Sequence, residues 1–147
     1  MSRNRRVVLD TCTLVSAALY TGSVPDQALS RALESFDLCA SVETQAELEQ
    51  VLDRGKFDRY RGRESRHAFV ATIRRRSLLF AVELADLPAV DPPCRDPKDN
   101  QLLALVMAAE ADLLVSSDED LLVLHPWRGI PILTPAGFLA RFPKSPA

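Results

Sequence analysis

The chain has 147 residues, of which 47% are hydrophobic and 26% are charged. This length suits one domain with a sizeable core, and the composition is that of an ordinary soluble domain. The net charge of −2 excludes a strongly basic nucleic-acid coat protein. It does not exclude a nuclease, because local charge matters more there than the sum. We therefore expect a single domain over residues 1–147.

Cysteine usage and the N-terminus indicate the cellular compartment. The three cysteines, Cys12, Cys39 and Cys94, are widely spaced, and no pair has the spacing of a zinc site or a redox motif. This pattern predicts free thiols in a reduced, cytoplasmic protein. The N-terminus is basic, but Asp10 interrupts the apolar run that follows, so we expect neither a signal peptide nor a membrane span.

The first predicted element is a buried strand. Val7, Val8 and Leu9 form an unbroken apolar run that ends at Asp10, which is typical of a parallel strand covered on both faces. A helix-forming run follows from about Thr11. Open α/β sheets bind their ligands at the carboxyl ends of the strands, so Asp10 is placed where a ligand would bind.

Helices and strands then alternate along the chain. Further helices are predicted over residues 26–35, 42–53 with Ser41 as N-cap, 64–79, 96–110 and 135–141. Further strands are predicted at residues 36–40, 81–84 at a sheet edge, 113–115 and 130–133, and residues 86–97, with four prolines, form an irregular connection. This alternation predicts an α/β fold with a mostly parallel sheet that helices cover on both faces.

Several acidic residues converge on one edge of this predicted sheet. Asp10 and Asp118 each follow a buried strand, and the carboxyl ends of parallel strands share an edge. Asp99 lies in the first turn of a helix that starts at that edge. The helix over 42–53 adds Glu43, Glu47 or Glu49, and this choice stays open on spacing alone.

A carboxylate cluster of this kind favours a divalent cation. Like charges in one cleft cost stability unless cations neutralise them. No histidine or cysteine stands at ligand spacing, so the site would offer oxygen ligands alone, which favours Mg²⁺ or Mn²⁺ over zinc. The matching chemistry is phosphodiester hydrolysis by a metal-activated water.

The ordered motifs resemble those of the PIN domain family. They are VVLDT, TQAELEQVL and RDPKDNQLLALVMAAEADLLVSSDEDLLVL, and the similarity spans residues 6 to about 142. The chain looks most like bacterial PIN proteins of toxin–antitoxin systems, related to VapC-type ribonuclease toxins. The resemblance implies a Rossmann-like, three-layer α/β/α sandwich and a metal-dependent endoribonuclease that acts on RNA. It also implies an antitoxin partner and a homodimer, for which Leu14, Val15 and the helix over 26–35 are candidate surfaces.

The resemblance also implies specific roles. Matched by position, the metal ligands and catalytic acids are Asp10, Glu47, Asp99 and Asp118. Supporting roles fall to three further residues: Asp96 as a helix cap, Asp120 through a metal-bound water, and Ser117 as a hydrogen-bond donor to a ligand carboxylate or to the phosphate. In one respect the chain departs from the family, because Cys12 stands where Asn or Ser is common, and a thiol is a poor hydrogen-bond partner for a metal-bound water.

Other interpretations remain open at this stage. Each acid alone has an ordinary role as a helix cap, turn residue or solvated charge; only their order together favours one site. Cys12 and the modest net charge also suit a PIN-fold binding or regulatory protein with little activity. A haloacid-dehalogenase-type phosphatase is disfavoured, because Cys12 occupies the place of its second aspartate. The basic residues between 54 and 76 form either a solvated surface or a track for RNA phosphates.

Overall fold

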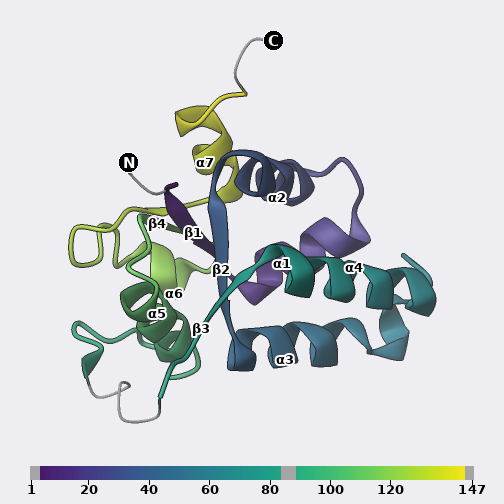
Figure 1. Ribbon diagram of the computed structural model, residues 1–147, viewed down its shortest axis with the longest axis horizontal. Helices are drawn as coiled ribbons and strands as arrows, with labels where there is room; N and C mark the ends of the chain where they lie inside the picture. The colour runs from purple at the N-terminus through teal and green to yellow at the C-terminus, as the bar shows by residue number, and fades with distance from the viewer. Residues whose placement is uncertain (1–3, 84–88, 145–147) are drawn as a thin grey trace.

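The fold is built on a parallel sheet. The computed structural model describes residues 4–83 and 89–144, and within them five strands form one sheet in the order β3-β2-β1-β4-β5 (Figure 1). Every pairing is parallel. The strands are β1 (Arg6–Leu9), β2 (Asp37–Ser41), β3 (Leu78–Phe80), β4 (Leu113–Val115) and β5 (Ile132–Leu133).

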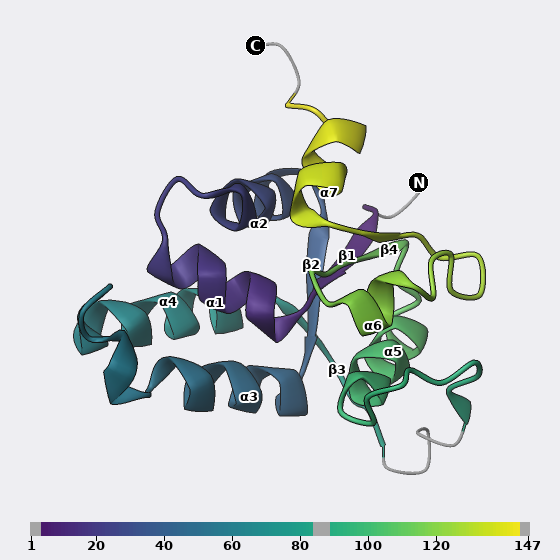
Figure 2. The ribbon, with the colours of Figure 1, turned by 180° about the vertical axis from the view of Figure 1, so that it is seen from behind.

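Helices cover both faces of the sheet. They are α1 (Thr11–Leu19), α2 (Val24–Ser35), α3 (Val42–Leu52), α4 (Arg63–Arg76), α5 (Asp99–Ala108), α6 (Glu119–Leu122) and α7 (Pro135–Arg141), with a short 3₁₀ turn, η1 (Gly55–Phe57). Figures 1 and 2 show α5 and α6 on one side of the sheet and α1, α3 and α4 on the other. The prediction of an α/β/α sandwich with a parallel sheet is therefore confirmed.

Strand alternation divides the core into two parts. Val7 and Leu9 of β1 pack with α1, α2, α3, α4 and α7, whereas Val8 between them packs with α5 and the loop that carries Trp127. All three β1 side chains are buried, as the unbroken apolar run predicted. No helix in the described residues is long and apolar enough to cross a membrane.

Side-chain caps fix where several helices begin. Ser41 caps α3, as predicted from the sequence, and forms a capping box with Thr44. Ser23 and Thr134 cap α2 and α7. Asp10 is the N-cap of α1 and accepts a hydrogen bond from the Thr13 N–H at 2.8 Å. The first acid of the predicted site therefore also starts a helix.

The structure corrects the boundaries of several predicted elements. The helix predicted over 64–79 ends at Arg76, because the Ser77 backbone is extended and its hydroxyl donates to the Ile73 carbonyl. The predicted edge strand 81–84 is instead β3 at 78–80, although it does lie at a sheet edge; Leu84 falls outside the described residues. Ile130 is not part of β5 but pairs with Trp127 across a short turn.

Candidate metal centre

A pocket opens where the parallel strands end. Its lining includes five carboxylates from four parts of the chain, together with the exposed Lys98. They are Asp10, Glu43, Glu47, Asp99 and Asp118. The pocket lies beside β1 and β4, where the strand order changes direction, which is where open α/β sheets bind ligands. The sheet thus brings together the four acids chosen from the sequence.

Asp10 is held in a buried position at the end of β1. Its side chain is 6% exposed, and one carboxylate oxygen accepts the Thr13 N–H as a helix cap. The other oxygen accepts a 2.5 Å hydrogen bond from the Ser116 hydroxyl. Both oxygens therefore have a protein donor, which fixes the orientation of the carboxylate in the pocket.

Ser116 also connects Asp10 to the second strand-end acid. Its hydroxyl oxygen accepts the Asp118 N–H at 2.9 Å, while Asp118 itself caps α6 through the Asp120 N–H at 2.9 Å. The bond to a ligand carboxylate, expected of Ser117, is thus made by Ser116, whereas Ser117 is exposed and its bond to the phosphate stays a prediction. Strand register explains the difference: Leu9 pairs with Val115, so Ser116 is the residue beside Asp10.

Asp99 lies in the pocket close to Asp118, and this proximity changes its pKa. Partial burial, a hydrogen bond with the Asp118 carboxyl and the charges of Asp118 and Asp96 raise the pKa of Asp99 to about 7. The Cys94 thiol donates to Asp99 Oδ2 at 3.7 Å and acts in the opposite direction. In the absence of a cation, the Asp99 carboxyl is therefore partly protonated at neutral pH.

Asp96 was predicted to cap the helix that became α5, but it lies in a turn before that helix. Its carboxylate accepts the Lys98 N–H at 3.0 Å and its carbonyl accepts the Asp99 N–H at 3.0 Å. These bonds form a turn that precedes α5. The helix begins at Asp99 rather than at 96–97, and its N-cap residue, Lys98, makes no side-chain capping bond.

The glutamates of α3 separate into two faces. Glu43 and Glu47 line the pocket, and Glu47 accepts a hydrogen bond from the Thr11 hydroxyl at 3.1 Å. Glu49 pairs instead with Arg74 at 2.6 Å, outside the pocket. Of the three glutamates that spacing left open, the geometry therefore excludes Glu49 and places both Glu43 and Glu47 at the pocket.

Cys12 and Asp120 lie around this cluster in different ways. The exposed Cys12 lines the pocket, and the pKa of its thiol is raised by partial burial and by the charges of Asp10, Asp118, Glu47 and Asp99. It therefore stays neutral and adds no further negative charge. Asp120 contributes its backbone to the cluster, because its N–H donates to Asp118 and its carbonyl accepts the Cys94 thiol at 3.3 Å.

The donor set suits a hard cation, although its side chains do not stand ready in a coordination shell. Within residues 4–83 and 89–144, no three His, Cys, Asp or Glu side chains are close enough together to hold an ion as they stand. Asp10 and Glu47 instead accept hydrogen bonds from Ser116 and Thr11. Carboxylate oxygens are the ligands that Mg²⁺ and Mn²⁺ prefer.

One candidate surface for a partner is corrected by the structure. Leu14 is 9% exposed and packs in the core with α2, so it is not available for docking. Val15, beside it on α1, is half-buried. The exposed apolar side chains nearby are Tyr20 and Val24, at the turn between α1 and α2.

Solved structures with similar folds include toxins of VapBC systems. VapBC2 from Rickettsia felis, solved bound to a promoter DNA fragment, matches with a TM-score of 0.62 and 12% identity, over 86% of this chain and 96% of that one. VapC20 from Mycobacterium tuberculosis, a toxin that cleaves the sarcin–ricin loop, matches with a TM-score of 0.56 and 16% identity, over 81% and 95%. PAE2754 from Pyrobaculum aerophilum matches with a TM-score of 0.63 and 12% identity, over 92% and 88%.

Family membership rests on sequence as well as on shape. No curated protein matches the chain in sequence. The family model of the PIN domain, however, matches residues 6–120, which include β1, the acidic cluster and the start of α6. Together with the parallel sheet and the acidic pocket at its carboxyl edge, this match shows that the chain belongs to the PIN domain family.

Proposed function

We propose that this protein is a Mg²⁺- or Mn²⁺-dependent endoribonuclease and the toxin of a toxin–antitoxin pair. The observation that carries the proposal is the convergence of Asp10, Glu47, Asp99 and Asp118 on one pocket. The fold shared with VapC toxins supports the toxin role, and with it an antitoxin partner, a homodimer and a cytoplasmic site of action.

The four acids would hold the cation, which supplies an activated water and positive charge opposite the phosphate oxygens. Ser116 orients Asp10 and Asp118 for that task, and Cys12 contributes a neutral thiol at the pocket wall. Asp99 must first lose its proton, since a protonated carboxyl is a poor ligand. The Lys98 ammonium at the rim has the charge to bind an oxygen of the incoming phosphodiester.

Cleavage assays on a mixed set of RNAs would test the activity. We expect purified protein to cut RNA with Mn²⁺, to lose this activity in EDTA and to lose at least 100-fold of it in Asp10→Asn, where the asparagine can still cap α1. Glu119→Gln is the matched control, since Glu119 is exposed and outside the pocket. Intact RNA in the presence of Mn²⁺, with a known nuclease active alongside, would refute the enzyme.

The second candidate is a PIN-fold binding protein with little activity. The observation in its favour is the absence, in the described part of the chain, of three acids already grouped for a metal. Calorimetric titration with Mn²⁺ separates the two functions, because a nuclease must bind the ion. If the titration at pH 8 shows no heat of Mn²⁺ binding, the result would favour the binding protein.

A further inference from the structure

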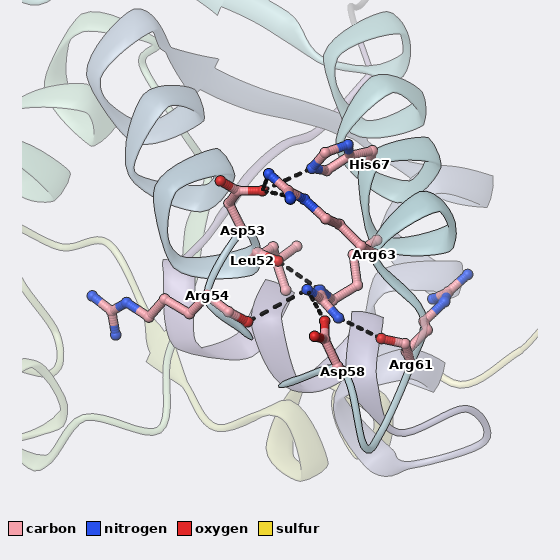
Figure 3. Close-up of polar contacts among 8 residues, drawn as sticks. Leu52, Asp53, Arg54, Asp58, Arg61, Arg63 and His67 are labelled. Carbon is pink, nitrogen blue, oxygen red and sulfur yellow. Dashed lines mark hydrogen bonds and ion pairs between the residues drawn. The ribbon is translucent and has the colours of Figure 1, made fainter. Parts of the chain in front are cut away.

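A buried arginine makes the connection between α3 and α4 a fixed structure. The Arg66 side chain is 0% exposed and donates to the carbonyl oxygens of Leu52 at 2.6 Å, Arg61 at 2.5 Å and Arg54 at 3.4 Å (Figure 3). It also donates to Asp58 Oδ1 at 2.8 Å. One guanidinium thus connects the last residue of α3 to three residues of the α3–α4 loop, which we define as residues 53–62. Arg66 is therefore not part of a basic surface, although the sequence placed it among the exposed basic residues between 54 and 76.

Along residues 53–63 the acidic side chains all have cationic partners, whereas only some of the cationic side chains have a protein partner within the described residues. Residues 53–63 contain five cationic and two acidic side chains. Asp58 is already paired with the buried arginine, and Asp53 binds both Arg63 and His67 at 2.9 Å. Arg61 donates to the Ala18 carbonyl at 2.7 Å and to the Ser65 hydroxyl at 2.6 Å. The acids are thus occupied, and two of the five cations have protein partners.

Three cations remain, and they form what we call the basic platform: Arg54, Lys56 and Arg59. All three are exposed, and within the described residues none of their side chains has a hydrogen bond or an ion pair. Lys56 lies over the Phe57 ring at 5.2 Å and Arg59 over the Tyr60 ring at 5.1 Å, which restrains both stems. Figure 3 shows the Arg54 side chain directed away from the Arg66 network.

The platform follows α3, the helix that contributes two glutamates to the acidic pocket. In α3, Glu43 and Glu47 line that pocket. The helix ends at Leu52, about 8 Å along its axis beyond Glu47, and Arg54 follows with an extended backbone. The exposed Gln50 lies in α3 between Glu47 and this end. In Figure 1 α3 starts at the end of β2, near α5, and runs outward from the sheet to the loop. The helix α3 and the loop after it therefore connect two of the pocket's carboxylates to three cations that have no ion pair among the described residues.

We propose that the basic platform binds the backbone phosphates of the single-stranded RNA that enters the pocket, an inference that rests on the proposed ribonuclease function. A polyanion cannot be held by an acidic pocket alone, so an enzyme of this kind needs cations close to it but outside it. The platform offers three such cations, on a loop that does not have to be ordered when RNA binds. Phosphate contacts of this type position the strand without selecting a sequence.

The platform can be tested by measuring how a fluorescein-labelled 12-mer of oligo(U) binds at different salt concentrations. The measurement is made in EDTA, which prevents metal-dependent cleavage. The test variant is Arg54→Gln with Lys56→Gln and Arg59→Gln. Each phosphate contact to a single strand contributes about 0.7 to the slope of log K against log salt, so we expect the slope to fall by about 2.

The matched control is the triple variant Arg74→Gln, Arg75→Gln and Arg76→Gln. It removes the same charge, but Arg74 pairs with Glu49, which lies about 200° around α3 from Glu47. We expect it to keep the wild-type slope. The platform is refuted if its own variant keeps the wild-type slope, if the control loses as much, or if wild-type protein binds no oligo(U) at 50 mM KCl.

Cleavage with Mn²⁺ then gives an independent readout. The platform variant should raise KM at least 10-fold and leave kcat within 2-fold, because its side chains do not reach the acids. An unchanged KM would overturn the proposal. If the wild-type protein cuts no RNA, the ribonuclease function fails, whereas the binding experiment in EDTA still decides whether the platform holds RNA.

Discussion

Ser116 illustrates how much of the candidate site depends on a side chain that is not itself an acid. Its hydroxyl donates to Asp10 at 2.5 Å and accepts the Asp118 N–H at 2.9 Å, and its side chain is fully buried. A buried carboxylate that loses a donor, and an N–H that loses an acceptor, each cost free energy.

Ser116→Ala should therefore lower the free energy of unfolding by about 2 kcal/mol. Because the Asp10 carboxylate would be free to turn, Mn²⁺ binding should weaken by about 10-fold. Urea unfolding and calorimetry measure the two effects. Ser117→Ala, at the exposed neighbouring position, should change stability by less than about 0.5 kcal/mol. Equal effects of the two substitutions would show that the Ser116 bridge has no special role.

Asp99 makes the stability of the metal-free protein depend on pH. Its pKa is raised to about 7 in the folded protein and is about 3.9 in an unfolded chain. Between these values the folded state binds more protons, so stability falls as pH rises from about 4 to about 7 and then levels off. Asp99→Asn removes this contribution.

We therefore expect the decrease in Tm between pH 5 and pH 8, measured in EDTA, to be smaller in Asp99→Asn than in the wild type. The substitution should also raise the Tm at pH 8, where it removes a charge that faces Asp118. Glu119→Gln, which changes an exposed acid outside the pocket, should keep the wild-type pH profile. A profile of Asp99→Asn that matches the wild type would contradict the raised pKa of Asp99.

At the scale of elements, the α3–α4 connection depends on Arg66. Arg66→Met keeps most of the side-chain volume but leaves the Leu52 and Arg61 carbonyl oxygens without their donor. The free energy of unfolding should fall by about 3 kcal/mol, since several hydrogen bonds to a charged group are lost together. Arg63→Met breaks an exposed pair with Asp53 and should cost less than about 1 kcal/mol.

Denaturant unfolding of both variants, with hydrogen exchange across residues 53–62, is the appropriate measurement. If local backbone propensity alone ordered the loop, its amide hydrogens would exchange at the wild-type rate in the Arg66→Met variant. Exchange that increases in the loop, and not in the sheet, would identify Arg66 as the group that orders the connection.

At the scale of the whole molecule, the sequence predicted most elements but not every boundary. Val7–Leu9 and Leu113–Val115 were found because strands buried on both faces are unbroken apolar runs. β3 was misplaced because Leu78 and Leu79 come just after α4 and were predicted to continue that helix. In the structure they are exposed residues of a strand. The four acids were predicted to share a cleft, and they line one pocket. Ser116 and the role of Arg66 were missed, and spacing alone did not decide among Glu43, Glu47 and Glu49, because register, burial and helix face appear only in three dimensions.

The acids of this pocket come from elements that are far apart in the chain. Asp10 follows β1, Glu47 lies on α3, Asp99 begins α5 and Asp118 caps α6. A cation held by all four would bind the folded state and not the unfolded chain, so it should stabilise the whole domain. At a free concentration 100 times its Kd, this linkage amounts to about 2.7 kcal/mol.

Thermal unfolding should therefore shift upward with Mn²⁺ in a concentration-dependent manner at pH 8, and less at pH 6, where the Asp99 proton competes with the ion. Asp118→Asn should abolish the shift, because it removes a carboxylate and keeps a side chain that can cap α6. Glu119→Gln, one residue further on and outside the pocket, should shift as the wild type does. An equal shift in Asp118→Asn would place the ion elsewhere on the protein, and the four acids would then have to be explained without it.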